Sequence, residues 1–226
     1  MDNNENFEID ENTQLNNENE VVLPKKRKVL PVVINVILVL LIIILAFRLF
    51  FNLTYTGIYV VGSSMMPTIT GAAEEGVEGG DYLFINKNAT PDYGDIVVVS
   101  ATDSKTSEVK IIIKRVIALA GDSLYLNDGD LFVKYAGTTE YIFVEENYLD
   151  ENNNKNDLRN TFSPVDVGEN QMFLMGDNRD NSKDSRDYGC FSTESLYGVV
   201  ADWSLSLKET ISTTYNFFKF DLNFNI

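Results

Sequence analysis

The 226-residue sequence has no histidine and only one cysteine, Cys190. Without an imidazole a Ser-His-Asp triad cannot form, so a nucleophilic serine would need a lysine or a carboxylate as its base. A single cysteine cannot form an intramolecular disulfide, and without histidine an ordinary zinc site is excluded. We therefore expect no metal and no cofactor, and we expect Cys190 to be a small, partly buried side chain.

Basic residues are also scarce, with 18 lysines and arginines against 34 aspartates and glutamates. The resulting net charge of -16 argues against a nucleic-acid partner, because neutralising phosphates requires clustered basic side chains. The hydrophobic content of 44% is sufficient for one domain with a substantial core.

The N-terminal region changes composition sharply. Residues 1–24 are rich in Asn and Glu, which is typical of a disordered tail. Residues 25–28 are all basic, and in residues 29–51 only Asn35 and Arg48 are strongly polar. About 20 apolar residues cross a bilayer as a helix, and flanking basic residues mark the cytoplasmic side. A cleavable signal peptide is disfavoured, because the apolar run is long and follows a tail.

We therefore predict three regions in the chain. Residues 1–28 form a cytoplasmic tail that ends in the basic cluster, residues 29–51 form a single transmembrane helix, and residues 52–226 form an extracytoplasmic domain.

The predicted extracytoplasmic domain contains short apolar runs bounded by turn residues, which indicates strands. These runs cover residues 58–61, 82–85, 96–99, 109–118, 124–126, 131–133, 141–144 and 171–175. The sequence NDGD at residues 127–130 is a strong hairpin signal. Because no helix alternates with the strands, we predict a mainly β fold with mixed or antiparallel sheets, and not a Rossmann-like fold.

Three further segments have distinctive compositions. The loops at residues 70–80 and 147–160 are polar and irregular, and both could border a cleft. Residues 218–226 alternate apolar and polar side chains with period two, so we predict a half-buried strand that covers the sheet. An apolar edge that touches the membrane interface is the alternative.

Ser64 and Lys114 are the candidate reactive residues. Ser64 follows a β-like run and precedes Pro67, which suits an exposed nucleophile at a strand end. Lys114 is flanked by isoleucine and valine, and burial there would favour the neutral amine; lowering its pKa by two units requires about 2.7 kcal/mol. Considered separately, Ser64 could be a turn serine and Lys114 could point to solvent.

A third segment, residues 173–189, places many hydrogen-bonding side chains directly after an apolar strand. Such a segment can form a fixed polar loop beside a site. The alternative interpretation is a solvated charged loop, which does not explain the apolar strand that leads into it.

Together these segments resemble the bacterial type I signal peptidases, membrane-bound serine endopeptidases that remove signal peptides from exported proteins. The resemblance includes the apolar anchor, SMMPT at residues 64–68, YGDIVV at 93–98, KRVIA at 114–118 with Gly121 and Asp122, and GDNR at 176–179 continuing through Ser182, Asp184, Ser185 and Arg186. The branch of the family that uses histidine in place of lysine is excluded, because the chain has none.

The resemblance implies a Ser-Lys dyad in which Ser64 attacks the scissile carbonyl and neutral Lys114 takes its proton. It implies that Ser182 orients the lysine and that ion pairs and hydrogen bonds fix the loop through Asp177, Arg115, Asp184 and Arg186. The backbone N–H of Ser64 would form part of an oxyanion hole. Gly62 stands where many Gram-negative members have a serine donor, which resembles Gram-positive members and leaves the second donor open.

For the substrate, the resemblance implies an extended peptide with small side chains at the first and third positions before the cut. Its pockets would lie near Val61, Gly62 and Met65, on a β-rich core of coiled sheets. The implied partners are exported preproteins, membrane lipid and the secretion translocon.

Two other functions fit parts of the sequence. A non-enzymatic, membrane-anchored assembly or binding protein could use the same fold, although the presence of both Ser64 and Lys114 argues against it. Self-cleaving Ser-Lys repressors share the catalytic logic, but they are cytosolic and have no use for the apolar anchor.

Overall fold

The computed structural model describes residues 29–222, except 75–76, 78, 103–105 and 151–157, with side chains described up to Phe217. The predicted tail and basic cluster lie outside this part of the chain. Helix α1 (Val29–Thr54) is long and apolar enough to cross a membrane, by length and composition. The chain divides into two compact units between Ala46 and Phe47, so the last turns of α1 belong to the second unit.

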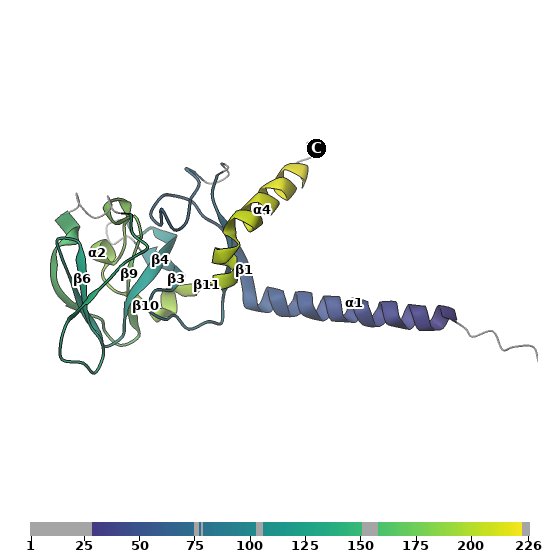
Figure 1. Cartoon of the computed structure of the whole chain (residues 1–226), viewed down its shortest axis with the longest axis horizontal. Coiled ribbons are helices and arrows are strands. Elements are labelled where there is room, and N and C mark those ends of the chain that lie inside the picture. Colours follow the sequence, from purple (N-terminus) through teal and green to yellow (C-terminus); the bar gives the residue numbers. More distant parts are fainter. Residues whose placement is uncertain (1–28, 75–76, 78, 103–105, 151–157, 223–226) are drawn as a thin grey trace, which may run out of the picture. The chain divides into compact units, whose positions relative to one another are not determined.

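The second unit contains two antiparallel sheets, which confirms the predicted mainly β fold (Figure 1). The larger sheet has seven strands in the order β1-β2-β11-β3-β4-β9-β10. Its strands are β1 (Tyr55–Tyr59), β2 (Tyr82–Asn86), β3 (Ile96–Thr102), β4 (Val109–Leu119), β9 (Gln171–Met175), β10 (Phe191–Ser192) and β11 (Leu196–Val200). The smaller sheet has the order β7-β6-β5-β8, with β5 (Ser123–Asn127), β6 (Asp130–Lys134), β7 (Ile142–Val144) and β8 (Phe162–Asp166).

The predicted hairpin joins β5 to β6. Asp128 and Gly129 have φ angles of 52° and 89°, and Asn127 pairs with Asp130. Two consecutive residues with positive φ match the twist of the flanking strands, so the hairpin prediction is confirmed.

Strand β4 is the element that organises the site. Its first part pairs with β3 from Val109 to Arg115, and from Arg115 it pairs with β9 on its other side. Buried apolar residues of β2, β3, β4 and β9 form the core under the larger sheet, and a further cluster lies beneath the smaller sheet. Cys190 packs against that second cluster and is partly buried, as predicted.

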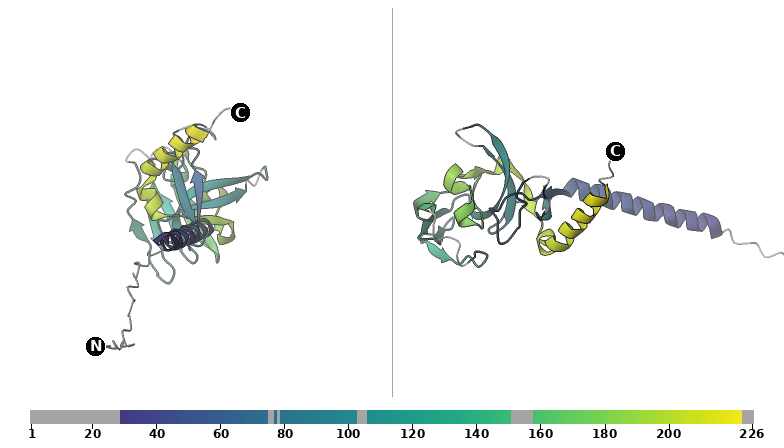
Figure 2. Two further views of the ribbon diagram at one scale, coloured as in Figure 1. Left: turned by 90° about the vertical axis from the view of Figure 1, so that its right-hand side faces the viewer. Right: turned by 90° about the horizontal axis from the view of Figure 1, so that it is seen from above.

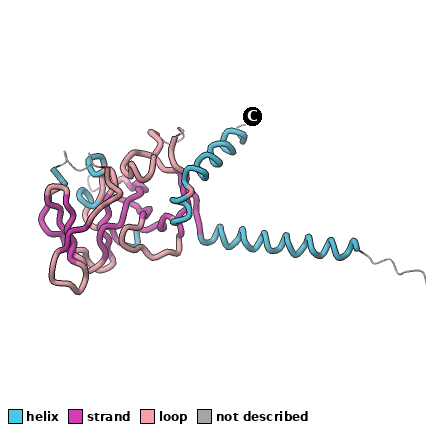
Figure 3. The backbone as a smooth tube through the Cα atoms, in the orientation of Figure 1, coloured by secondary structure: helices cyan, strands magenta, loops and turns pink. Residues whose placement is uncertain are grey.

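The remaining helices are short, apart from the last one (Figure 3). They are η1 (Leu158–Asn160), η2 (Arg179–Asn181), α2 (Ser185–Tyr188), η3 (Thr193–Ser195), α3 (Asp202–Ser206) and α4 (Lys208–Leu222). Helix α4 and the smaller sheet lie at opposite ends of the second unit in Figure 1 and in the right-hand view of Figure 2.

The predicted strand at residues 218–226 is wrong up to Leu222, which is helical, and residues 223–226 lie outside the described chain. The reason is that the part of β2 that does not pair with β11 has other hydrogen-bond partners for its N–H groups. The Tyr82 and Phe84 N–H groups donate to the hydroxyls of Ser212 and Ser204, at 2.8 and 2.7 Å. Helical serines therefore provide the acceptors that an added strand would have provided.

Candidate active site

Ser64 lies in a turn that follows β1 and is tied to the loop at residues 70–80. The Gly62 N–H donates to the Ala72 carbonyl at 2.8 Å, and the Ala72 N–H donates to the Val60 carbonyl at 3.0 Å. The approach is close enough that a Cβ on Gly71 would lie 1.8 Å from the Gly62 carbonyl oxygen. Gly62 itself has a φ of +85°, a conformation that favours glycine. This turn is therefore fixed before it reaches Ser64.

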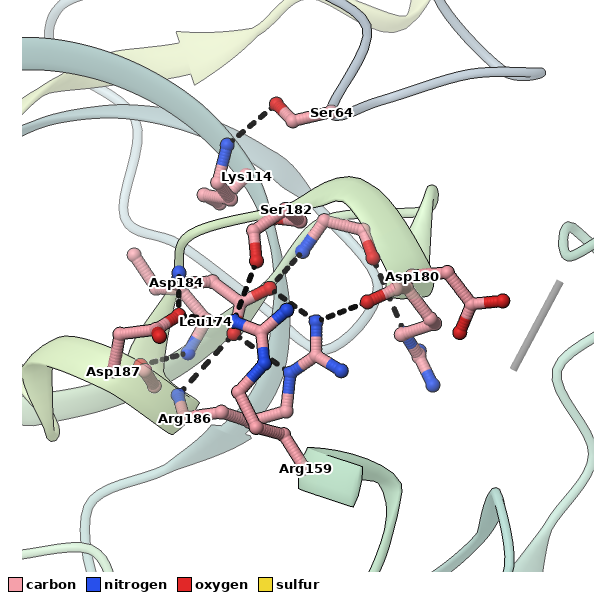
Figure 4. Close-up of polar contacts among 12 residues, drawn as sticks. Ser64, Lys114, Arg159, Leu174, Asp180, Ser182, Asp184, Arg186 and Asp187 are labelled. Carbon is pink, nitrogen blue, oxygen red and sulfur yellow. Dashed lines mark hydrogen bonds and ion pairs between the residues drawn. The ribbon is translucent and has the colours of Figure 1, made fainter. Parts of the chain in front are cut away.

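Lys114 contacts Ser64 directly, although the two residues are 50 positions apart (Figure 4). The Lys114 Nζ donates to the Ser64 Oγ at 2.7 Å and to the Ile113 carbonyl oxygen at 2.7 Å. Lys114 is only 2% exposed, so the interpretation in which it points to solvent is wrong. The structure thus brings the two candidate reactive atoms within hydrogen-bonding distance.

Burial changes the proton affinity of this amine. Removal from water lowers the pKa of Lys114 to about 8, while the carboxylates of Asp184 and Asp177 partly oppose the shift and Arg186 adds to it. At pH 7 a pKa near 8 leaves about a tenth of the amines neutral, against fewer than about one in a thousand for an ordinary lysine. A usable fraction of Lys114 can therefore accept a proton at neutral pH.

Arg115, which follows Lys114 on β4, fixes the loop after β9. Its guanidinium donates two hydrogen bonds to Asp177, at 2.8 and 2.6 Å, and a third to the Gly94 carbonyl at 2.7 Å. It also lies 4.0 Å from the centre of the Tyr148 ring. Bidentate pairing of this kind fixes orientation as well as distance. Arg115 therefore joins the loop before β8 and β9, which contains Tyr148, to the loop after β9, which contains Asp177.

A second ion pair lies deeper. Asp184 is buried and accepts two hydrogen bonds from Arg186, each at 2.9 Å, and one from the Gly176 N–H at 3.0 Å (Figure 4). Burial alone would raise the pKa of Asp184, but these donors and the Arg186 charge lower it below its ordinary value. Asp184 also caps α2 by accepting from the Arg186 backbone N–H.

Ser182 is buried in the same cluster and faces Asp184 in Figure 4. Its hydroxyl interacts with the Asp184 carboxylate (Figure 4) and helps to lower the pKa of Asp184, and it makes no hydrogen bond to Lys114 in the described chain. A Cβ on Gly176 would lie 2.3 Å from this Oγ and 2.4 Å from the Ser64 carbonyl oxygen. The predicted role of Ser182 in orienting the lysine stays a prediction.

Asn178 and Asn181 hold the Ser64 turn from the other side. The Asn178 N–H donates to the Ser64 carbonyl at 3.0 Å, and its side chain donates to the Ser63 carbonyl at 3.1 Å. The Asn181 side chain donates to the Ser63 Oγ at 2.7 Å. Neither asparagine was predicted to have a role, although both lie in the polar segment at residues 173–189.

A buried ion pair between Arg179 and Glu146, which was not predicted from the sequence, lies in the same region. Arg179 is fully buried and makes a bidentate contact with Glu146, which also accepts a hydrogen bond from Tyr148. Tyr148 belongs to the loop predicted to be irregular, and Glu146 directly precedes that loop. Glu146 and Tyr148 were visible in the sequence as a carboxylate close to an aromatic residue. Composition alone did not indicate that Arg179 would pair with them.

A cleft of about 520 Å³ opens beside Ser64 and Lys114. Its walls are largely apolar and come from three segments: Ile58, Tyr59, Val60 and Val61 with Ser64; Val98; and Ile111, Ile112 and Ile113 with Lys114. Val61 therefore lies where a substrate pocket was predicted. Gly62 and Met65 are not among these lining residues, and Met65 is 1% exposed and packs in the core with Ile69 and Leu83.

The chain is similar to several known proteins. Signal peptidase I P from Bacillus subtilis subsp. natto is 36% identical over 147 residues, which cover 62% of this chain and 72% of the relative. Signal peptidase I U from Bacillus subtilis strain 168 is 31% identical over 193 residues, covering 81% of this chain and 91% of the relative. A solved signal peptidase I from Enterococcus faecalis aligns with 50% of this chain and 98% of its own, at 25% identity and a TM-score of 0.38.

The model of the family described as signal peptidase, peptidase S26, matches residues 32–203. That span contains most of α1, both sheets, and all of the candidate site residues. The chain belongs to the signal peptidase family, peptidase S26.

Proposed function

We propose that the chain is a membrane-anchored signal peptidase I that cleaves signal peptides from exported preproteins with a Ser64–Lys114 dyad. Its family membership and its relatives support the removal of signal peptides. The observation that carries the proposed dyad is the 2.7 Å contact between the Lys114 Nζ and the Ser64 Oγ, with the amine 2% exposed at the base of a cleft.

In the proposed reaction, neutral Lys114 removes the Ser64 hydroxyl proton as the Ser64 Oγ bonds to the scissile carbonyl carbon. The resulting ammonium then gives its proton to the leaving amine as the peptide bond breaks, which leaves an ester on Ser64. Lys114 then deprotonates a water molecule whose oxygen bonds to the ester carbonyl carbon, and the resulting ammonium returns the proton to the Ser64 oxygen as the ester bond breaks. The amine is neutral at the start and at the end, so no external acid or base is needed.

The oxyanion of the tetrahedral intermediate needs donors, and the Ser64 N–H is the one that we propose. The Gly62 N–H is already bound to the Ala72 carbonyl, and glycine has no hydroxyl to offer. The second donor must therefore come from another group, and its identity stays open. We assign Asp177, Arg115, Asp184 and Arg186 to positioning the loop that holds the Ser64 turn, and Ser182 to orienting Lys114.

The substrate would add a strand beside β4. From Val109 to Lys114, β4 pairs with β3 on one side, and its pairing with β9 on the other side begins only at Arg115. The other edge of residues 111–113 lines the cleft, opposite Val60 and Val61. An extended peptide can bond to such an edge with its backbone while alternate side chains enter apolar pockets. We propose that small residues before the cut are selected in this way.

We also propose the membrane arrangement. Helix α1 would cross the bilayer once, with the basic residues 25–28 and the tail in the cytoplasm and the rest of the chain outside. This arrangement would place the cleft on the side where exported preproteins emerge, beside membrane lipid and the secretion translocon.

The test is cleavage of a purified preprotein by the full chain in detergent. Ser64→Ala and Lys114→Ala should each reduce the rate by at least about a thousandfold, since both belong to one catalytic unit. Lys114→Arg should be equally inactive, because arginine stays protonated. The matched control is Lys110→Ala on the same strand, whose side chain is 58% exposed and pairs with Glu108. Cleavage at the wild-type rate by either dyad variant would refute the proposed dyad.

A further inference from the structure

Helix α4 begins after the residues that the family model matches, which end at 203, and yet it reaches both sides of the proposed site. We infer that α4 is a positioning element for the proposed peptidase: Lys208 holds the segment that follows Ser64, and Tyr215 supports the Tyr59 wall of the cleft. The inference rests on the proposed function for its kinetic readout, and a binding experiment tests it separately.

The first contact is made by Lys208, at the start of α4. Its Nζ donates to the Thr68 carbonyl oxygen at 2.6 Å and lies 3.7 Å from a carboxylate oxygen of Asp81. Asp81 in turn accepts the Thr70 N–H at 2.8 Å. Lys208 therefore holds the segment after Ser64 at the Thr68 carbonyl. Asp81, which lies beside Lys208, holds the same segment at the Thr70 N–H. Loss of the ammonium would release Thr68 and leave Asp81 less compensated.

The second contact is made by Tyr215, nearly two turns further along α4. Its ring stacks on Tyr82 of β2 at 4.1 Å and lies 5.8 Å from the ring of Tyr59. Tyr59 lines the cleft, and its hydroxyl donates to the Val77 carbonyl at 2.6 Å and accepts the Gly80 N–H at 3.0 Å. Tyr59 is therefore held at its hydroxyl end by the loop at residues 70–80 and along its ring by α4.

A simpler role for α4, which is to cover the edge of β2, explains only part of these contacts. That edge is satisfied by the hydroxyls of Ser204 and Ser212, which accept the Phe84 and Tyr82 N–H groups. Besides its stack on Tyr82 of β2, Tyr215 also contacts Tyr59, and Lys208 contacts Thr68; neither of these two contacts supplies a backbone partner to β2. The two roles are therefore separable by substitution of Lys208 and Tyr215 with both serines intact.

The kinetic experiment compares cleavage of two preproteins that differ only in having Ala or Leu at the third position before the cut. Tyr215→Ala should reduce the preference for Ala by about tenfold, because an unsupported Tyr59 ring no longer limits the pocket. Lys208→Met should lower kcat by about tenfold with KM unchanged, because the Ser64 segment loses a hydrogen bond from a charged donor. Tyr215→Phe and Lys208→Arg should retain wild-type behaviour, as should the control Thr213→Ala, an exposed position on the same helix.

The binding experiment uses the full chain carrying Ser64→Ala and two synthetic signal peptides with the same Ala or Leu difference. Adding Tyr215→Ala should again reduce the ratio of the two Kd values by about tenfold. If Ser64→Ala still cleaves, the proposed dyad fails, and the preference for Ala over Leu in the cleavage experiment still decides the role of Tyr215. The inference is overturned if the wild-type chain cleaves and Tyr215→Ala and Lys208→Met both behave like Thr213→Ala. That means the same kcat, the same Ala/Leu preference in cleavage and the same ratio of the two Kd values. In that case α4 only covers the sheet edge.

Discussion

Replacement of Lys114 by methionine should stabilise the domain at neutral pH while abolishing cleavage. Lys114 has an ordinary pKa of 10.5 when unfolded and a pKa of about 8 when buried. The unfolded chain therefore binds this proton more tightly, so the folded state is disfavoured by the burial of Lys114 at pH values below about 8. A pKa difference of this size corresponds to about 3 kcal/mol at pH 7. Methionine has a similar length and no charge, so it removes that cost.

The substitution also removes favourable contacts. The Ser64 hydroxyl and the Ile113 carbonyl each lose the donor at 2.7 Å, for a combined loss of about 1–3 kcal/mol. The net effect at pH 7 is therefore a stabilisation of about 1 kcal/mol. At pH 10.5 the cost of burying Lys114 has almost disappeared, because the amine is then neutral in the folded state and about half neutral in the unfolded state. There the same substitution should destabilise the domain by about 1–2 kcal/mol.

The assay is urea unfolding of the full chain in detergent at pH 7 and pH 10.5, followed by the fluorescence of Trp203, the single tryptophan. The difference in unfolding free energy between Lys114→Met and wild type should shift by about 3 kcal/mol between the two pH values. Other groups that titrate in this range do so in both proteins and cancel. Lys110→Met, at an exposed position of β4, should show no such shift. A constant difference for Lys114→Met would show that the amine is not held with a lowered pKa.

Three further predictions follow from the same geometry. The kcat/KM of the wild-type chain should rise about tenfold per pH unit below pH 7 and level off above about pH 8, because neutral Lys114 is the active form, and a flat profile over that range would contradict this role. Gly176→Ala should reduce cleavage by at least about a hundredfold, since its Cβ would lie 2.4 Å from the Ser64 carbonyl oxygen and displace the nucleophile; an active, folded variant would contradict it. Glu146→Gln should lower the unfolding free energy by about 3–5 kcal/mol, because it leaves Arg179 buried without its charge partner, whereas the exposed Glu108→Gln should change it little.

Local patterns predicted most of the sheet and failed where an element depends on distant partners. The hairpin at Asp128 and Gly129 follows from turn chemistry within four residues, so the sequence was sufficient. The strands β8, β10 and β11 were missed, because β10 has only two residues and the other two contain Pro164 and Gly198, which are unfavourable inside a strand. The start of residues 218–226 was mistaken for a strand, because Ser204 of α3 and Ser212 of α4 accept hydrogen bonds from N–H groups of β2 more than 100 residues away. The periodicity of residues 218–226 contained no information about that edge.

The candidate site shows the same limit in one pair of residues. Lys110 and Lys114 lie on one strand, four positions apart, and period two directs their side chains to the same face. The side chain of Lys110 is 58% exposed, whereas Lys114 is 2% exposed. They differ because only Lys114 lies where the Ser64 turn and the loop at residues 176–186 close over β4, and those segments meet through Asn178 and Gly176. An apolar strand can therefore indicate that a lysine is buried. The lowered pKa on which the proposed chemistry depends, however, comes from segments that only the folded chain brings together.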